Sequence, residues 1–197
     1  MIVGGRWDET GRAQMALLQS EGLAPHHRLL DIGAGAMRLG CRAVPFLDAG
    51  NYWATDASRA LMLRGRSEEL AEPSRLPKHH LIADDGFRYR GIPTGIDYAI
   101  AFAVFTHLPA DRLGGALNRA RIAFPRLQAF LFTVFLGPEG EGSVRQADGV
   151  VTHPDRPPWH ISEDAVRRMV EEASFDLRRR DDVLPRGQVC FVARPSR

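Results

Sequence analysis

The stretch from Leu29 to Arg38 constrains the fold of this chain more than any other. Its first four residues, Leu-Leu-Asp-Ile, are typical of a buried parallel strand. Gly33 and Gly35 then break that pattern, and a helical pattern follows. A strand, a glycine turn and a helix in this order present backbone N–H groups to a ligand in open α/β sheets. The stretch therefore predicts a ligand-binding turn, with a plain strand-to-helix turn as the alternative.

The size and composition of the chain narrow its class. Its 197 residues fit one domain spanning residues 1–197, and the formal net charge of +2 gives little reason to expect a nucleic-acid partner. Two cysteines, Cys41 and Cys190, form no CxxC pair, which argues against a disulfide scaffold or a zinc site. No apolar run approaches the roughly 20 residues that span a bilayer, and we see no signal peptide. We expect a cytoplasmic protein without a membrane partner.

Helical and strand patterns alternate along most of the chain. We expect helices over residues 8–20, 38–48, 59–72 and 162–173, and another that residues 106–109 lead into and that ends near residue 124. We expect strands over residues 29–32, 52–56, 79–83, 96–102 and 128–135. The first 22 residues would form a helical cap at the N-terminus. This alternation predicts a parallel sheet with helices on both faces.

The last third of the chain departs from the alternation. Residues 137–159 show no helical or strand period and hold several Gly and Pro, which predicts a mobile, functional loop. Residues 175–179 and 188–193 read as two strands joined too tightly for a crossover. We therefore expect a terminal hairpin that places one antiparallel strand in the sheet.

The glycine turn carries a resemblance to a known family. It reads Asp31-x-Gly33-x-Gly35-x-Met37. This is similar to motif I, acidic-x-Gly-x-Gly-x-Gly, of the class I S-adenosylmethionine-dependent methyltransferases, with the third glycine missing.

Three further stretches of the sequence strengthen the resemblance. Residues 22–33 look like the approach to motif I in bacterial small-molecule methyltransferases, and residues 47–56 look like the path into motif II. Residues 105–109, Phe-Thr-His-Leu-Pro, resemble what often follows the fourth strand. The resemblance covers about residues 11–193. It implies a three-layer, Rossmann-like α/β fold with a seven-stranded, mostly parallel sheet and a C-terminal antiparallel hairpin.

Asp56 is the strongest candidate for a ligand contact. It ends a short strand 23 residues after Gly33, a spacing that places a carboxylate beside a ribose. In the family, the acid at this place accepts hydrogen bonds from both ribose hydroxyls of S-adenosylmethionine. A carboxylate suits the task because it only accepts hydrogen bonds when ionised. The alternative role is to cap the helix that begins near Ser58.

The resemblance implies S-adenosylmethionine as cofactor and S-adenosylhomocysteine as product. The cofactor-binding residues that it implies are Asp31, Gly33, Ala34, Gly35, Arg38, Asp56, Ala57, Asp84, Asp85, Gly86, Phe87, Phe102 and Ala103. Gly33 and Gly35 would let the backbone approach the methionine part, and Asp31 would meet its amino group. Phe102 and Ala103 stand where the family's backbone carbonyl meets the ammonium.

Asp84 and Asp85 compete for one role, a hydrogen bond to the adenine amino group. We favour Asp85, because Gly86 and Phe87 follow it and would supply a backbone donor and a ring wall. The alternative is that both acids are solvated at a strand end.

The acceptor side is less constrained. His107 follows the fourth strand and is a candidate general base, since a histidine ordinarily titrates with a pKa near 6.5. The alternative is a histidine that bonds the neck of the next helix. His153 and His160, in or beside the long loop, are candidates to line an acceptor pocket. Trp7 and Trp159 are candidates for its aromatic walls, with core or lid packing as their alternative. We find no acidic metal triad and assign no metal.

The sequence therefore predicts transfer of a methyl group from S-adenosylmethionine to an oxygen or nitrogen of a small-molecule acceptor. No Asn/Asp-Pro-Pro-Phe/Tyr and no Pro-Cys follows the fourth strand, unlike in DNA methyltransferases. The arginines of residues 178–180 are followed directly by the acids of residues 181–182. Because these opposite charges neutralise one another, the stretch indicates a solvated face rather than a nucleic-acid patch. The alternatives are a non-catalytic binding or scaffold protein of the same fold, and an NAD-binding Rossmann protein.

Overall fold

The computed structural model describes residues 7–140 and 142–196 of the chain. The part of the expected helical cap that lies in residues 1–6 is outside the described residues. The long helices are α1 (Trp7–Ser20), α2 (Gly40–Phe46), α3 (Arg59–Glu68), α4 (Asp111–Ala123) and α5 (Glu163–Glu172). The main strands are β1 (Leu29–Ile32), β2 (Tyr52–Asp56), β3 (Leu81–Ala83), β4 (Tyr98–Ala101), β5 (Ala129–Leu136), β9 (Phe175–Arg179) and β10 (Val189–Pro195).

The main strands form one sheet in the order β3-β2-β1-β4-β5-β10-β9. The pairs from β3 to β5 are parallel, whereas β10 runs antiparallel to both β5 and β9. A short strand β8 (His160–Ile161) adds to β5 as an eighth strand. The predicted α/β class, the mostly parallel sheet and the terminal hairpin are confirmed.

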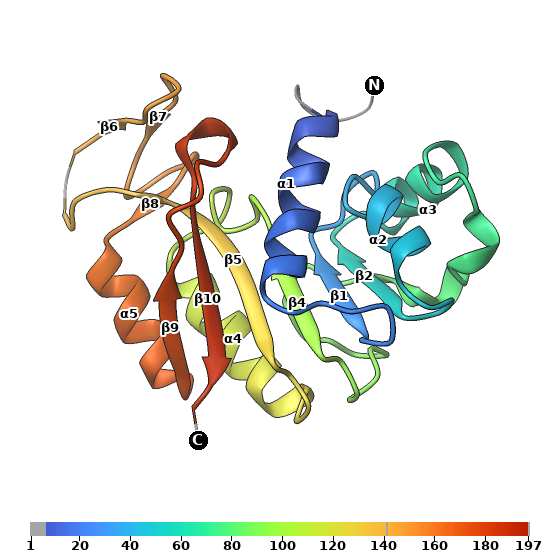
Figure 1. Cartoon of the computed structure of the whole chain (residues 1–197). Coiled ribbons are helices and arrows are strands. Elements are labelled where there is room, and N and C mark those ends of the chain that lie inside the picture. The colour runs from blue at the N-terminus through green and yellow to red at the C-terminus, as the bar shows by residue number, and fades with distance from the viewer. Residues whose placement is uncertain (1–6, 141, 197) are drawn as a thin grey trace.

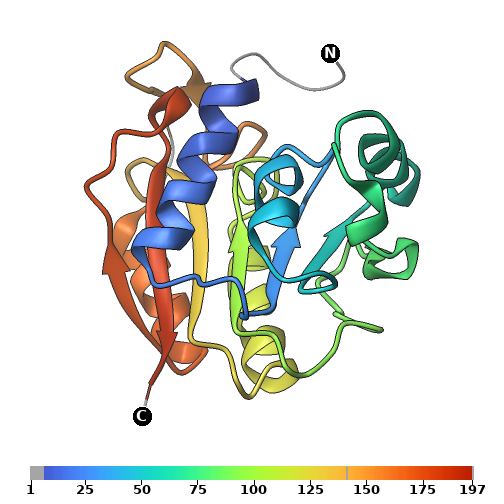
Figure 2. The ribbon, with the colours of Figure 1, turned by 45° about the vertical axis from the view of Figure 1, so that its right-hand side comes forward.

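The sheet separates two apolar cores, because successive residues of a strand point to opposite faces. Leu29 belongs to the core that includes side chains of α1, α2 and α3, whereas its neighbour Leu30 belongs to the core that includes side chains of α4 and α5. Figure 1 shows α1 and α2 in front of the sheet and α4 behind it. In Figure 2, turned by 45°, α1 still lies over the same face as α2. The described residues thus form three layers, helix, sheet and helix.

Several predicted boundaries were wrong. The third strand begins at Leu81, because His79 and His80 belong to a 3-10 turn, η2 (Lys78–His80). The His80 ring stacks on Trp53 with centroids 3.6 Å apart, and its Nδ1 lies 3.1 Å from the Tyr52 carbonyl oxygen. The fourth strand is shorter than predicted, and α3 ends four residues early. The helix α4 begins at Asp111, after the residues 106–109 that were expected to lead into it.

Residues 137–161, which we call the flap, contain strands that the sequence did not predict. β6 (Val144–Arg145) pairs with β7 (Val151–Thr152), and β8 follows. Strands of two residues are too short to give a period. Gln146 Nε2 donates to the Leu136 carbonyl (3.0 Å) and to Thr152 Oγ1 (2.9 Å), which ties the flap to the end of β5.

Glu21, just after α1, connects the first helix to the terminal hairpin. Its side chain is only 2% exposed and pairs with Arg178 (2.5 Å), Arg194 (3.0 Å) and Arg180. Burial raises the pKa of Glu21, but hydrogen bonds and charge from these arginines outweigh it and hold the pKa below its usual value. Arg180 also pairs with Asp182, as the sequence suggested. The arginines therefore do more than neutralise a solvated face, because they hold α1 against β9 and β10.

Candidate functional site

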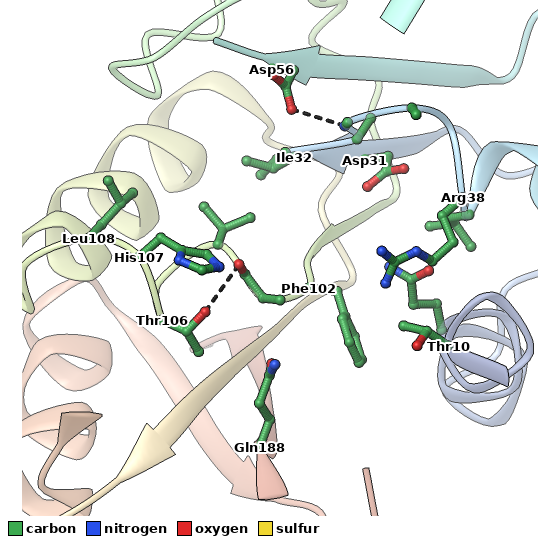
Figure 3. Close-up of a pocket in the computed structure, with 18 of the residues that line it drawn as sticks. Thr10, Asp31, Ile32, Arg38, Asp56, Phe102, Thr106, His107, Leu108 and Gln188 are labelled. Carbon is green, nitrogen blue, oxygen red and sulfur yellow. Dashed lines mark hydrogen bonds between the residues drawn. The ribbon is translucent and has the colours of Figure 1, made fainter. Parts of the chain in front are cut away.

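The carboxyl ends of β1, β2, β3 and β4 open into a cavity of about 540 Å³. Figure 3 shows side chains from several of these elements turned toward this space. The predicted site residues that line it are Trp7, Asp31, Gly33, Ala34, Gly35, Arg38, Asp56, Ala57, Asp84, Asp85, Phe87, Phe102, Ala103 and His107. The sequence thus predicted most of one wall of the cavity.

The glycine turn has the geometry that a ligand cradle needs. Gly33 has φ +72°, and a Cβ there would lie 2.5 Å from Cγ2 of Val104. Gly35 has φ +53°, and a Cβ there would meet nothing within 4 Å, because it would project into open space. Met37, at the missing glycine, also adopts the left-handed conformation with φ +70° and is fully buried. The turn therefore keeps its shape despite the substitution, at a conformational cost of about 1–2 kcal/mol.

Asp56 connects the glycine turn to the start of α3. Its Oδ2 accepts from the Gly35 N–H at 2.9 Å, and its Oδ1 accepts from the Ser58 N–H at 2.8 Å. Ser58 in turn caps α3 by accepting from the Leu61 N–H at 3.2 Å. Asp56 therefore holds the glycine turn, a role that the sequence did not predict, and supports the N-cap residue Ser58 without being the cap itself. Each carboxylate oxygen keeps a second acceptor position for a ligand.

Asp31 is a buried acid behind the glycine turn. The Tyr52 hydroxyl donates to its Oδ2 at 2.5 Å. Burial raises the pKa of Asp31 to about 7, helped by the charge of Asp56 and opposed by the Tyr52 hydrogen bond and by Arg38. A cation bound beside Asp31 would favour its ionised form.

The two acids after β3 have different surroundings. Asp84 Oδ1 accepts from the Gly86 N–H at 3.0 Å and Oδ2 accepts from the Tyr89 N–H at 2.8 Å, so this carboxylate folds the turn. Asp85 is exposed, and no described side chain or backbone N–H donates to its carboxylate. Phe87 is buried beside it with φ +56°. Gly86 itself is not part of the cavity wall.

Arg38 carries positive charge into the cavity. Its guanidinium lies over the Trp7 ring, 5.3 Å from the centroid. Figure 3 shows it directed between Asp31 and Thr10. Burial lowers the pKa of Arg38, and the nearby charge of Arg186 lowers it further. Both arginines line the cavity, and their like charges act on each other.

His107 lies at the cavity rim and is exposed. The segment between β4 and α4 is held by Thr106, the residue before His107. Its Oγ1 donates to the Ala103 carbonyl at 3.1 Å (Figure 3). No described residue hydrogen bonds to the His107 ring. The ring is therefore accessible to a bound molecule.

His153 and His160 lie outside the cavity wall and pack within the flap. His153 Nδ1 is 2.7 Å from Ser143 Oγ, and the buried His160 has Nδ1 3.0 Å from Thr152 Oγ1. Val150 and Pro158 are the flap residues that line the cavity instead.

Sequence reasoning missed the residues that α1 and the start of β10 add to the cavity. These are Thr10, Gln14, Arg186 and Gln188. Because β10 is antiparallel, its N-terminal end meets the carboxyl ends of the parallel strands. No motif marks this placement, although the predicted hairpin implies it.

Comparison with solved structures shows which fold this is. A magnesium protoporphyrin IX methyltransferase from Synechocystis with bound S-adenosylhomocysteine matches with a TM-score of 0.69 at 15% identity, over 96% of this chain and 83% of that chain. A Burkholderia thailandensis 1,6-didemethyltoxoflavin-N1-methyltransferase matches with a TM-score of 0.63 at 18% identity, over 96% and 80%. The chain has the class I methyltransferase fold.

A third match has similar coverage at lower identity. An S-adenosylmethionine-dependent methyltransferase from Clostridium acetobutylicum gives a TM-score of 0.67 at 11% identity, over 97% of this chain and 92% of that chain. No family model matches the sequence, and no curated protein matches it. The class I methyltransferase fold also differs from the all-parallel 3-2-1-4-5-6 sheet of dinucleotide-binding Rossmann proteins, because β10 is antiparallel.

The described residues were also compared with what a membrane span and a metal site require. No helix within residues 7–140 and 142–196 is long and apolar enough to cross a membrane. The same residues contain no group of three or more His, Cys, Asp or Glu side chains that would hold a metal ion.

Proposed function

We propose that the chain is a single-domain, cytoplasmic S-adenosylmethionine-dependent methyltransferase that methylates an oxygen or nitrogen of a small molecule. The observation that carries the proposal is the position of Asp56, hydrogen-bonded to the Gly35 N–H at the edge of the cavity. A carboxylate fixed at a glycine turn is the arrangement that suits a nucleoside ribose. The wall residues would also supply a partner for each polar group of this cofactor.

The ribose and the adenine of the cofactor would meet different residues along the cavity wall. Asp56 would accept from the two ribose hydroxyls with its remaining acceptor positions. Asp85 would accept from the adenine amino group, because no donor of the described residues binds its carboxylate whereas Asp84 already holds the turn, and Phe87 would lie beside the ring. Gly35 leaves open space where a side chain would obstruct the ligand.

The amino-acid end of the cofactor would meet two opposite charges. Arg38 would bind its carboxylate, because a guanidinium makes paired, charge-assisted hydrogen bonds to that group. Asp31 would face its ammonium, which stabilises the ionised form of this buried acid. Trp7 holds the Arg38 guanidinium in place by stacking on it.

Catalysis in such a site depends on alignment. S-adenosylmethionine would supply a methyl group on a sulfonium, which a nucleophile displaces in line. The chain would hold the acceptor close to that methyl group, and orientation of this kind accounts for a large part of many rate enhancements. His107 would take a proton from an acceptor that must lose one.

The non-catalytic alternative has two grounds, the missing third glycine and the lack of a sure catalytic base. Met37 adopts a left-handed conformation that a glycine would also adopt, which lessens the first ground. The second depends on the role of His107. The proposal includes no nucleic-acid partner.

Calorimetric titration of the purified protein with S-adenosylmethionine tests the proposal. We expect saturable binding, together with a higher melting temperature in S-adenosylmethionine than in NADH. Conversion of S-adenosylmethionine to S-adenosylhomocysteine with a panel of small acceptors would exclude a scaffold role. A folded protein that binds neither form of the cofactor would refute the proposal.

A further inference from the structure

The amide of Gln188 is oriented by a chain of hydrogen bonds. The Ala103 N–H donates to Thr133 Oγ1 at 2.7 Å, and Thr133 Oγ1 donates its one hydrogen to Gln188 Oε1 at 2.6 Å. The amide oxygen is therefore bound to the protein. The Nε2 group, with its two N–H donors, is left for the cavity that Gln188 lines.

This donor has no partner in the protein. Gln188 is only 6% exposed, and no acceptor among residues 7–140 and 142–196 receives a hydrogen bond from its Nε2. The Nε2 atom is open to the cavity rather than sealed in the core, so this largely buried and fixed amide offers its donors to a ligand that accepts hydrogen bonds. Figure 3 shows Gln188 rising from the start of β10 toward the open space between His107 and Arg38.

Arg186 lies two residues away in the 3-10 turn η3 (Pro185–Gly187) and lines the same cavity. It adopts φ +66°, a left-handed conformation that residues other than glycine rarely adopt. The neighbouring side chains of Leu184 and Pro185 are buried and fix the turn. No acid of the described chain pairs with Arg186; Asp182, the nearest acid in sequence, pairs with Arg180. Backbone strain of this kind is often found at ligand sites.

The two ends of the cavity differ in charge. Acids gather at the β1, β2 and β3 end, where Asp31, Asp56 and Asp85 would contact the cofactor. The β10 end presents hydrogen-bond donors, the amide of Gln188 and the guanidinium of Arg186. Since Arg38 would be occupied by the cofactor carboxylate, these two donors remain for a second molecule.

We propose that the methyl acceptor is an organic anion, and that Arg186 and Gln188 bind its carboxylate or an equivalent oxyanion. The inference rests on the proposed function, because it takes the other end of the cavity as the cofactor site. Arg186 supplies charge, and Gln188 supplies a donor of fixed direction, so together they orient the acceptor as well as bind it. They are specificity residues and take no part in moving the proton.

The test uses two matched pairs of probes, benzoate with benzamide and 4-hydroxybenzoate with 4-hydroxybenzamide. The protein is first titrated with S-adenosylhomocysteine, which reports on the proposed function alone. The loaded protein is then titrated with each probe at about pH 8. We expect each acid to bind at least about tenfold tighter than its amide, since a charge-assisted hydrogen bond accounts for that difference.

Three variants assign the preference to these residues. Arg186→Gln should reduce the ratio of acid to amide affinity to near one, with the affinity for S-adenosylhomocysteine within about twofold of the parent. Gln188→Glu keeps an acceptor for Thr133 but places a carboxylate opposite the anion, so it should also remove the preference. Arg90→Gln, an exposed arginine that does not line the cavity, is the matched control and should change nothing.

The outcomes separate the two proposals. If S-adenosylhomocysteine binds but no acid binds better than its amide, or if Arg186→Gln leaves the ratio unchanged, the anionic acceptor is refuted and the methyltransferase proposal stands. If S-adenosylhomocysteine does not bind to the folded protein, both proposals fall.

Discussion

The carboxylate of Asp56 accepts a hydrogen bond from the backbone N–H of Gly35 at 2.9 Å, across the gap between β2 and the glycine turn. The residue proposed to bind the ribose therefore also holds the turn proposed to bind the methionine part. Ligand contact and turn geometry are coupled through one side chain. Substitutions of Asp56 should consequently affect the turn as well as the contact.

Arg38 is predicted to act on one part of the cofactor only. Arg38→Gln should weaken S-adenosylhomocysteine binding by about tenfold or more, because a charge-assisted hydrogen bond to the carboxylate is lost. 5′-Methylthioadenosine lacks that carboxylate, so its affinity should change by less than about twofold. Calorimetry with both ligands checks this, and equal losses for the two would show that Arg38 does not bind the carboxylate.

Asp31 should make the stability of the ligand-free protein fall as pH rises toward neutrality. Its pKa is raised from 3.8 to about 7 in the folded state, so between these values the folded chain holds a proton that the unfolded chain has lost. Folding is therefore favoured at low pH, and the contribution is lost as pH rises through the folded pKa. Asp31→Asn removes this contribution and still offers an oxygen to Tyr52.

Denaturant unfolding of the parent and Asp31→Asn at about pH 5 and about pH 8 measures the effect. The free energy of unfolding of the parent, relative to the variant, should be lower at the higher pH. The buried histidines His80 and His160 titrate in both proteins, so they cancel in this difference. A difference that does not vary with pH would show that Asp31 is ionised throughout.

Glu21 is predicted to stabilise the fold rather than the site. Glu21→Gln leaves three arginines without their shared carboxylate, and removing one partner of a buried pair costs about 3–5 kcal/mol. We expect the lower end, because Arg178 and Arg194 are about half exposed. Asp182→Asn, which breaks only a partly exposed pair with Arg180, should cost less than about 1 kcal/mol. Similar losses in urea unfolding would contradict the account.

His107→Ala should separate binding from turnover. The ring contacts no described residue through a hydrogen bond, so the affinity for S-adenosylhomocysteine should stay within about twofold of the parent. With an acceptor found by screening, kcat should fall by about a hundredfold if the ring removes a proton. An unchanged kcat across the pH range would remove His107 from the proposed chemistry.

The sequence predicted those parts of the molecule that local patterns control. The strand and turn around Gly33, the spacing to Asp56 and the Ser58 cap are local, and all appear where expected. The flap strands were missed because two residues cannot show a period. His79 and His80 were misassigned because an apolar neighbourhood extended the strand pattern backwards into a turn held by Trp53.

The β10 end of the cavity could not be predicted because only the tertiary fold brings it there. Gln188 precedes a strand whose antiparallel direction decides where its start lies. Its orientation depends on Thr133, 55 residues away in the chain. Arg186 and Gln188 carry no local motif, so their role becomes visible only once the sheet order is known.

The titration of S-adenosylhomocysteine into the parent protein, Asp56→Asn and Asp56→Ala tests the central claim most directly. Asp56→Asn keeps one oxygen acceptor, but its NH2 group would face a backbone N–H and a ribose hydroxyl that both donate, so binding should weaken by about tenfold or more. Asp56→Ala should weaken it more, with circular dichroism unchanged. Parent-like affinity in a folded Asp56→Ala protein would contradict the placement of the cofactor.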